Sequence, residues 1–447
     1  MPKPSGERAV VATLIGALLV LAACTPTERA GVRNGRGTPE RPRRGGSVVF
    51  GVVGAPATLD PYAPEASDLT YALVRPLYPS LYRFLPDGST EPYLAEEIVR
   101  SGRRAVLTLK PLRWSDGRRV TARDVVLSAR RARRPSGFAA FERVRAVAAR
   151  RVELIGRVPR VERALATAAF VLPRGVAGRR WGGPFAMRSH RPGLEIVYEA
   201  NPRWRGARPY LERVTVRFVQ SEAQLLLLLE RGQLDAAAPL SATNLAETIP
   251  EPIAMRGALG WETVVLDFEG SELARPERAA IAGALDRAAI EGVFVRSAGR
   301  LANTTAPAPG SDGAEGPWPG ALARRRPPPG TVDLSGPAGD ALLELVRRAA
   351  YTQLSQRGID VDAVSVDPTS FYSTWGVGAE TDVAIRRRSA APPWRRVVEG
   401  VRRLDSFPLL QVKTFVAWRP PMRGLVPNPT IEGPLWNVER WWRAEGA

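Results

Sequence analysis

One long apolar run, from Ala9 to Ala23, is the feature that most restricts what this chain can become. Lys3 and Arg8 precede the run and give it the positively charged start of an export signal. The run is shorter than the roughly 20 apolar residues that a membrane-spanning helix needs. No later segment is both long and apolar enough to cross a bilayer, so we expect no membrane span after the signal.

The apolar run ends in Leu21-Ala22-Ala23-Cys24, and Cys24 is the only cysteine of the chain. These four residues resemble the lipobox of bacterial lipoproteins, in which the cysteine thiol receives a diacylglyceryl group. The resemblance implies that residues 1–23 are a lipoprotein signal peptide and that Cys24 is the lipidated residue, held at a membrane by its acyl chains. The alternative is an ordinary secretory signal whose cleavage site happens to precede this cysteine.

The length of the chain requires more than one hydrophobic core. A single core stops growing at roughly 250 to 300 residues, and this chain has 447. Its hydrophobic share of 44% and charged share of 24% are typical of folded domains. Residues 24–44 are rich in Pro, Gly, Thr and Arg without an apolar period, so we expect a flexible tether there and two or more lobes from about Gly45 onward.

The chain has one cysteine and one histidine, which excludes several kinds of site. No intrachain disulfide and no Cys/His zinc cluster can form, and His190 would have to be the base of any Ser-His-Asp system. His190 lies in the polar segment 188–192, which we expect to be a solvated loop between two extended segments. No motif indicates a metal, a phosphate loop or a redox cofactor. We therefore expect no enzyme, no catalytic residue, no metal and no cofactor; an exported hydrolase that uses His190 is one alternative.

The net charge of +19 and the isoelectric point near 11 come almost entirely from arginine. Lys3, Lys110 and Lys413 are the only lysines, and arginine is spread along the chain among Ala, Gly and Pro. A nucleic-acid site normally combines basic residues with aromatic residues that stack on bases. Because no such motif is present, we expect no nucleic-acid partner, although the charge would favour contact with anionic lipids.

Local signals predict a mixture of strands and helices. Ser221 and Gln224 form a capping box for a helix, and Gly232 is well placed to end it. Pro276 suits the first position of another helix. The segments expected to be strands are 45–51, 105–110, 195–199, 214–219, 363–366 and 382–385. The segments expected to be helices begin at Thr121 and Pro276 or span 222–231 and 338–357.

The segment from Lys110 to Val125 carries the most specific resemblance to a known family. A lysine, an aromatic residue, Asp-Gly, Thr-Ala and Asp-Val recur there with the spacing typical of the family 5 extracellular solute-binding proteins, which capture peptides and similar solutes for ABC transporters. The matching residues are Lys110, Trp114, Asp116, Gly117, Val120, Thr121, Ala122, Asp124 and Val125. Shorter matches extend the resemblance from about Gly45 to Trp442: Leu59-Asp60-Pro61, Trp181 to Phe185 with tryptophan in place of a usual glycine, Asn201-Pro202, a helix from Arg278 to Ile290, and a late strand pair, 407–410 and 414–417.

The resemblance implies an α/β protein with the two-lobed periplasmic-binding-protein-like fold, type II and of the large cluster C class, with an extra small subdomain and a hinge of crossover strands. Lobe I would be discontinuous and formed by residues 45–60, 179–266 and 419–447. The small subdomain would take residues 61–178, and lobe II would take residues 267–418.

In peptide-binding members of the family an aspartate pairs with the free amino group of the ligand, and this chain departs from that pattern. The position falls at or near Ala391, and a buried ammonium needs a compensating charge, which argues against standard capture of a peptide N-terminus. Arg386, Arg387 and Arg388 precede it, and guanidinium groups bind carboxylate or phosphate. Side chains alternate along a strand, so at most two of the three would face a cleft. The alternative for each arginine is a solvent-exposed position at the edge of the sheet.

Aromatic residues are the other candidates for contact with a solute, because closing lobes commonly enclose apolar ligand surface. Tyr78 stands in a Tyr-Pro-Ser-Leu segment where the family usually has Tyr-Glu-x-Leu. The alternative for every aromatic candidate is core packing. The full set of candidate substrate-binding residues is Tyr78, Trp181, Phe371, Trp375, Arg386, Arg388 and Trp394.

The function implied by the resemblance is that of an extracytoplasmic substrate-binding lipoprotein of an ABC importer. It would capture a peptide or peptide-like solute between its lobes and deliver it to permease subunits. We expect a monomer on the outer face of the cytoplasmic membrane, in the cell envelope, anchored through Cys24. The alternative within the same fold is a degenerate lipoprotein that acts as a sensor or envelope interaction protein.

Overall fold

The computed structural model describes most of the chain after the tether. The described residues are 41–132, 136–174, 180–240, 252–294, 299–301, 330–338, 340–367, 371, 381–389 and 403–444. Residues 42–447 form a compact unit of their own. Within the described ranges, no helix has both the length and the apolar character that crossing a membrane requires.

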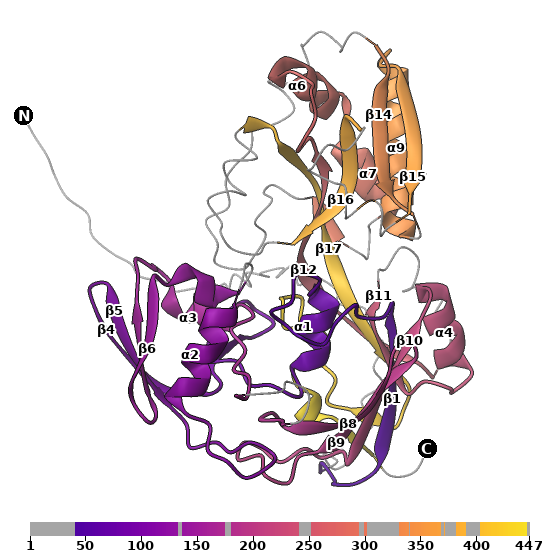
Figure 1. Cartoon of the computed structure of the whole chain (residues 1–447). Helices are drawn as coiled ribbons and strands as arrows, with labels where there is room; N and C mark the ends of the chain where they lie inside the picture. Colours follow the sequence, from indigo (N-terminus) through magenta and orange to yellow (C-terminus); the bar gives the residue numbers. More distant parts are fainter. Residues whose placement is uncertain are drawn as a thin grey trace, which may run out of the picture. The chain divides into compact units, whose positions relative to one another are not determined.

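An eleven-stranded sheet runs through this unit (Figure 1). Its order is β15-β14-β16-β12-β17-β11-β1-β10-β9-β8, and β13 pairs with β17. The pairs β1/β10, β1/β11, β14/β15 and β14/β16 are parallel, and the others are antiparallel. The strands are β1 Ser47–Val53, β8 Phe185–Arg191, β9 Glu195–Ala200, β10 Arg213–Val219, β11 Ala236–Leu240, β12 Ala254–Asp267, β13 Gly299–Leu301, β14 Val332–Pro337, β15 Val361–Val366, β16 Val383–Ser389 and β17 Ser406–Trp418.

Two separate hydrophobic cores lie along this sheet. The first contains Phe50 of β1 and Trp441, whose rings lie 5.1 Å apart, and the second contains Leu266 of β12 and Phe407 of β17. β12 and β17 pair from one end to the other. β17 contributes to both cores, since Val416 lies in the first and Phe407 in the second. The second core also includes Leu225 and Leu229 of α4, so it packs against the far side of the same sheet as well as around β12 and β17.

The late strand pair expected at 407–410 and 414–417 is wrong, because the two segments form the single strand β17. The intervening residues Gln411, Val412 and Lys413 contain no turn former. β12 and β13 both pair with them and keep the backbone extended.

A smaller antiparallel sheet has the order β4-β5-β7-β6. Its inward side chains, including Leu107 and Val152, join the first core, and helix α2 packs against β6 and β7. The elements are β4 Ala95–Ser101, β5 Arg104–Leu109, α2 Ala122–Arg131, β6 Arg143–Ala148, β7 Arg151–Ile155 and α3 Val161–Ala166. Two short pairs, β2 Tyr82–Phe84 with β3 Thr90–Pro92 and β18 Met422–Arg423 with β19 Trp442–Arg443, complete the described sheets.

Side-chain caps mark the start of some of the other helices. Ser221 accepts from the amide of Gln224 at the start of α4, and Gly232 follows its end with φ of +68°. Asp340 accepts from the amides of Leu342 and Leu343 at the start of α9. These helices are α1 Asp68–Val74, α4 Glu222–Glu230, α6 Arg275–Ala284, α7 Arg287–Phe294 and α9 Ala341–Gln356, with 3-10 turns at Gly137–Ala140 and Val438–Arg440.

The helix expected to continue from Arg278 to Ile290 is interrupted. α6 ends at Ala284, and α7 begins at Arg287. The amide of Asp286 donates to Gln353 of α9 at 2.7 Å instead of continuing a helical bond, while its carboxylate accepts from the amide of Ala289. A contact with a distant helix thus sets the break.

Candidate functional site

The aromatic candidates Tyr78 and Trp181 lie against each other. Tyr78 follows helix α1, Trp181 precedes β8, and their ring centroids are 5.6 Å apart with planes tilted by 40°. Both side chains are buried in the first core. The structure therefore brings these two predicted residues together as a packed pair.

Glycines hold the Trp181 segment close to its neighbours. Trp181 is tied to Ser115 by two hydrogen bonds, from its amide to Ser115 Oγ at 3.1 Å and from the Ser115 amide to its carbonyl at 2.8 Å. A Cβ on Gly182 would lie 2.7 Å from the Trp114 ring, and one on Gly183 would lie 2.3 Å from the Pro76 carbonyl oxygen. Only glycine allows the backbone to pass so close to these groups.

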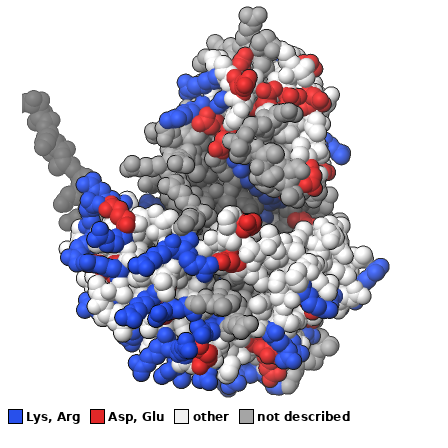
Figure 2. All heavy atoms as spheres, viewed as in Figure 1, with Lys and Arg blue, Asp and Glu red and all other residues white. Residues whose placement is uncertain are grey.

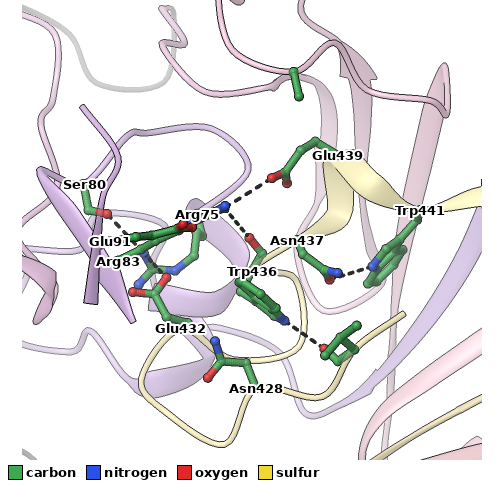
Figure 3. Close-up of polar contacts among 12 residues, drawn as sticks. Arg75, Ser80, Arg83, Glu91, Asn428, Glu432, Trp436, Asn437, Glu439 and Trp441 are labelled. Atoms are coloured by element: carbon green, nitrogen blue, oxygen red, sulfur yellow. Dashed lines mark hydrogen bonds and ion pairs between the residues drawn. The ribbon is translucent and has the colours of Figure 1, made fainter. Parts of the chain in front are cut away.

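A buried ion pair supports the chain just before Tyr78. Arg75, at the end of α1, and Glu432, near the C-terminus, place Nη1 and Oε2 2.5 Å apart, with side chains 5% and 0% exposed (Figure 3). Glu432 also accepts from the amide of Phe84 at 3.0 Å. Burial lowers the pKa of Arg75 and raises the pKa of Glu432 to about 7, while their mutual attraction acts in the opposite direction on both.

Arg83 forms the second half of this buried network. Its Nε donates to Glu91 at 2.5 Å, and its Nη1 donates to Glu439 and to the Trp436 carbonyl, both at 3.2 Å. The guanidinium also lies over the rings of Tyr93 and Trp436. Removing one partner of a buried charge pair typically costs about 3 to 5 kcal/mol, so Arg75 and Arg83 fix the C-terminal segment to the chain around Tyr78.

Hydrogen bonds from and within the C-terminal segment complete the attachment (Figure 3). Asn428 donates to the Phe84 carbonyl at 3.0 Å, and Asn437 donates to the Gly424 carbonyl at 2.9 Å. Trp441 donates to the side chain of Asn437 at 2.9 Å. Sequence reasoning missed this network, because the partners that matter most lie at opposite ends of the chain.

The arginine candidate Arg386 lies on β16 and pairs with acids at the end of β12. Its Nε donates to Asp267 at 2.7 Å, its Nη2 lies 2.5 Å from the same carboxylate, and Glu269 lies 3.5 Å away. Asp267 is fully buried. Arg386 is in register with Val265, which shares a face of β12 with Asp267. The guanidinium thus already has a carboxylate partner.

Its neighbour Arg387 contacts a different element. Arg387 donates to Asp340, at the start of α9, at 2.7 Å. Burial raises the pKa of the Asp340 carboxyl, but Arg387 and the amides at the helix start outweigh it and hold that pKa below its usual value. Arg386 and Arg387 therefore have partners on separate elements, as the alternation of side chains along a strand predicts.

The other candidates are less fully placed. Phe371 is buried, in a described position isolated along the chain. The backbone of Arg388 belongs to β16, opposite Thr263 of β12, while its side chain lies outside the described part. Three further predicted or aligned positions lie outside the described residues, as does the lipidation candidate: Trp375, Ala391, Trp394 and Cys24.

His190 does not lie in a loop, contrary to the expectation from its polar surroundings. It belongs to β8, opposite Ile196 of β9, and the turn between the strands comes later, at Gly193 with φ of +72°. The side chain is half-buried, and burial lowers its pKa. Its Nε2 has no hydrogen-bond partner among the described residues, so no nucleophile is paired with that atom there.

Acidic and histidine side chains do not gather into a metal site in the described part of the chain. No group of three or more His, Cys, Asp and Glu side chains is arranged to hold a metal ion among the residues that the structure describes. The described candidate residues are packed aromatic rings and arginines that are paired with carboxylates.

Comparison with known proteins shows which sequences this chain resembles. Residues 176–327 match the model of the middle region of the bacterial extracellular solute-binding proteins, family 5. A curated relative, the probable D,D-dipeptide-binding periplasmic protein DdpA of Escherichia coli K12, is 35% identical over 63 residues. That match covers 14% of this chain and 12% of the relative.

Solved structures match nearly the whole chain. The oligopeptide-binding protein AppA of Bacillus subtilis, in complex with a nonapeptide, has a TM-score of 0.76 at 18% identity, over 91% of this chain and 100% of that chain. NikZ of Campylobacter jejuni, in complex with Ni(L-His), has 0.75 at 14% identity, over 89% and 99%. AgaA of A. tumefaciens R10, in complex with agropinic acid, has 0.74 at 17% identity, over 90% and 99%. These matches confirm the expected two-lobed type II fold.

Proposed function

We propose that the chain is a member of family 5 of the bacterial extracellular solute-binding proteins, whose model residues 176–327 match. In this proposal it captures a peptide or peptide-like solute between its lobes and delivers it to the permease of an ABC importer. The observation that carries this proposal is the agreement of the family match with a fold that aligns to ligand-bound receptors over about nine tenths of the chain. Proteins of this family bind solutes and are not enzymes.

The two cores and their connecting strands support a hinge mechanism. The buried residues form two clusters, and β17, which pairs along its length with β12, contributes to both. A ligand that contacts both lobes stabilises the closed state by the difference in its affinity for the two states. A permease that recognises the closed state then receives only loaded receptor, and no bond is made or broken.

The ligand class is drawn from the described candidates and from the relatives. Tyr78, Trp181 and Phe371 are the aromatic candidates, all three of them buried, and Arg386 and Arg388 are the basic candidates, two residues apart on β16. Arg386 is paired with buried Asp267, so an anionic ligand group at this point would have to share the guanidinium with that carboxylate. Peptides and solutes of the kinds bound by the solved relatives are therefore the first to test.

The sequence signals at the N-terminus supply the cellular setting of the proposal. Residues 1–23 direct export, Cys24 carries the lipid, and residues 24–44 act as a tether to the outer face of the cytoplasmic membrane. The receptor works there as a monomer. Labelling with a radioactive fatty acid tests the anchor: the intact chain takes up label, and the Cys24→Ala variant does not.

A degenerate receptor that has become a sensor or an envelope interaction protein is the second candidate. Tyr78 and Trp181 bury each other, and Arg386 is occupied by Asp267, which leaves these three residues satisfied without a ligand. Mass spectrometry of the intact protein under native conditions separates the two functions. A solute retained through purification, and released on unfolding, supports the receptor; a mass equal to the polypeptide after exposure to cell extract supports the degenerate form.

A further inference from the structure

The positive charge of the chain is concentrated in one segment, and the even spread expected from the sequence is wrong there. Residues 95–160 contain 18 Arg and Lys but only 6 Asp and Glu. Residues 252–418, by contrast, contain 20 Arg and Lys and 19 Asp and Glu. A general preference for arginine would affect both segments alike, so the excess belongs to the small sheet β4-β5-β7-β6 and helix α2.

The outer face of this small sheet carries much of the excess. Arg104 of β5, Arg151 of β7, and Arg143 and Arg145 of β6 occupy outward positions, as the register with the inward residues shows, and all four are exposed. Glu153 lies between Arg104 and Arg145 and is covered by ion pairs with both. We call this surface the arginine face.

More basic side chains extend the arginine face at both ends of the sheet. At one end, Arg157 follows Gly156, whose amide donates a hydrogen bond to the carbonyl of Arg103. At the other end, the carbonyl of Arg150 bonds the amide of Leu109. Among the described residues, Arg143, Arg151 and Arg157 have no ion-pair partner and are exposed. Figure 2 shows Lys and Arg gathered over this part of the molecule.

Aliphatic side chains accompany the arginines. Val99 of β4 is 57% exposed and Val147 of β6 is 48% exposed, and both lie on the same small sheet. Arginines on an edge strand can serve simply to prevent two sheets from pairing. That role needs charge only on the edge strands β4 and β6, whereas Arg104 and Arg151 lie on the inner strands β5 and β7.

We propose that the arginine face docks on the surface of an anionic lipid bilayer. Guanidinium groups pair with lipid phosphates, and exposed valines add apolar contact with the interface. A nucleic acid would instead be expected to stack its bases on aromatic side chains, and the four strands of the small sheet contain none. The inference is independent of the proposed solute-binding function and of the lipid on Cys24.

Residues 42–447 are used for the test, because they form a compact unit with both hydrophobic cores and lack the signal and Cys24. Co-sedimentation is measured with vesicles of phosphatidylcholine alone and with phosphatidylglycerol added. The first variant combines Arg143→Gln, Arg151→Gln and Arg157→Gln. The control combines Arg231→Gln, Arg348→Gln and Arg357→Gln, three exposed arginines outside the small sheet, and removes the same charge.

We expect binding only to vesicles with phosphatidylglycerol, weakened by added salt. The first variant should bind them roughly 100-fold more weakly, at about 1 kcal/mol per arginine near the surface, and the control should lose far less. Equal loss in the control, equal binding to both vesicle types, or no binding to either would overturn the proposal. Tighter binding to single-stranded DNA than to the anionic vesicles would overturn the assignment to lipid.

Discussion

Arg75 and Glu432 form an ion pair of 2.5 Å that lies out of contact with water, although one residue ends the first helix and the other is close to the C-terminus. Through this pair and the contacts of Arg83 with Glu439, the last described segment is fixed to the chain that leads into Tyr78. A receptor that closes about a hinge needs lobes that move as rigid bodies. The network provides that rigidity in the first core.

Replacing one partner of this ion pair should be costly. At pH 8.5, above the raised pKa of Glu432 of about 7, Glu432→Ala leaves Arg75 buried without its carboxylate and is expected to lower the free energy of unfolding by about 3 to 5 kcal/mol. The combined Arg75→Met and Glu432→Leu variant should recover most of that loss, because it buries no uncompensated charge. Urea unfolding of residues 42–447 measures all three proteins. A double variant as unstable as Glu432→Ala would contradict the assignment of the cost to an unpaired charge.

The raised pKa of Glu432 predicts a distinctive pH dependence. Between its ordinary pKa and about 7, the native state retains a proton that the unfolded state releases. The contribution of Glu432 to stability is therefore full below the ordinary pKa and is lost as the pH rises through about 7. We expect the difference in unfolding free energy between wild type and Glu432→Gln to fall as the pH rises from 4.5 to 7.5. A difference that grows with pH would refute this assignment.

The glycines beside Trp181 predict a second stability effect. A methyl group on Gly183 would meet the Pro76 carbonyl oxygen at 2.3 Å, so Gly183→Ala should destabilise the fold by about 1 to 3 kcal/mol. Gly292, in helix α7, has no atom within 4 Å of its would-be Cβ. Gly292→Ala should instead stabilise by up to about 1 kcal/mol. Thermal unfolding of both variants compares the same glycine-to-alanine change at a crowded and at an open position. Similar changes in the unfolding midpoint would show that Gly183 does not lie close to the Pro76 carbonyl.

The ion pair of Arg386 with Asp267 predicts that replacing Arg386 mainly lowers the stability of the fold. Arg386→Ala leaves buried Asp267 without its main cation and should cost about 3 kcal/mol or more of unfolding free energy. Arg348, which is exposed on α9, serves as the control, and Arg348→Ala should change stability by less than about 0.5 kcal/mol. If Arg386→Ala abolished ligand binding but left the unfolding curve unchanged, the guanidinium would be a ligand contact rather than a structural partner.

Local signals were sufficient to predict many elements of the fold. The cap at Ser221, the strand around Phe50, and the mixed α/β class all follow from neighbouring residues. The family resemblance of the Lys110 to Val125 segment also anticipated the two-lobed fold. Such signals lie within a few residues of one another, where propensity and capping decide the conformation.

The errors arose where distant residues decide the local structure. The break between α6 and α7 depends on Gln353, and the continuity of β17 depends on strands on both sides of it. The position of His190 within β8 was missed because a polar segment can pair with a neighbouring strand at the edge of a sheet. The partners of Arg75 and Arg386 were missed for the same reason, since Glu432 and Asp267 are far away in sequence.

A thermal-shift screen of residues 42–447 tests the solute-binding function most directly. The panel contains di- to hexapeptides, the nonapeptide class, sugars, opines and anionic metabolites, with a destabilised Gly183→Ala sample to show that the assay detects changes in the fold. A ligand that binds only the native state stabilises it by about 2.7 kcal/mol at a free concentration 100-fold above its Kd. We predict a saturable rise in the unfolding midpoint with peptides or peptide-like solutes; a folded protein whose midpoint moves with no member of the panel would contradict the account and favour the degenerate envelope lipoprotein.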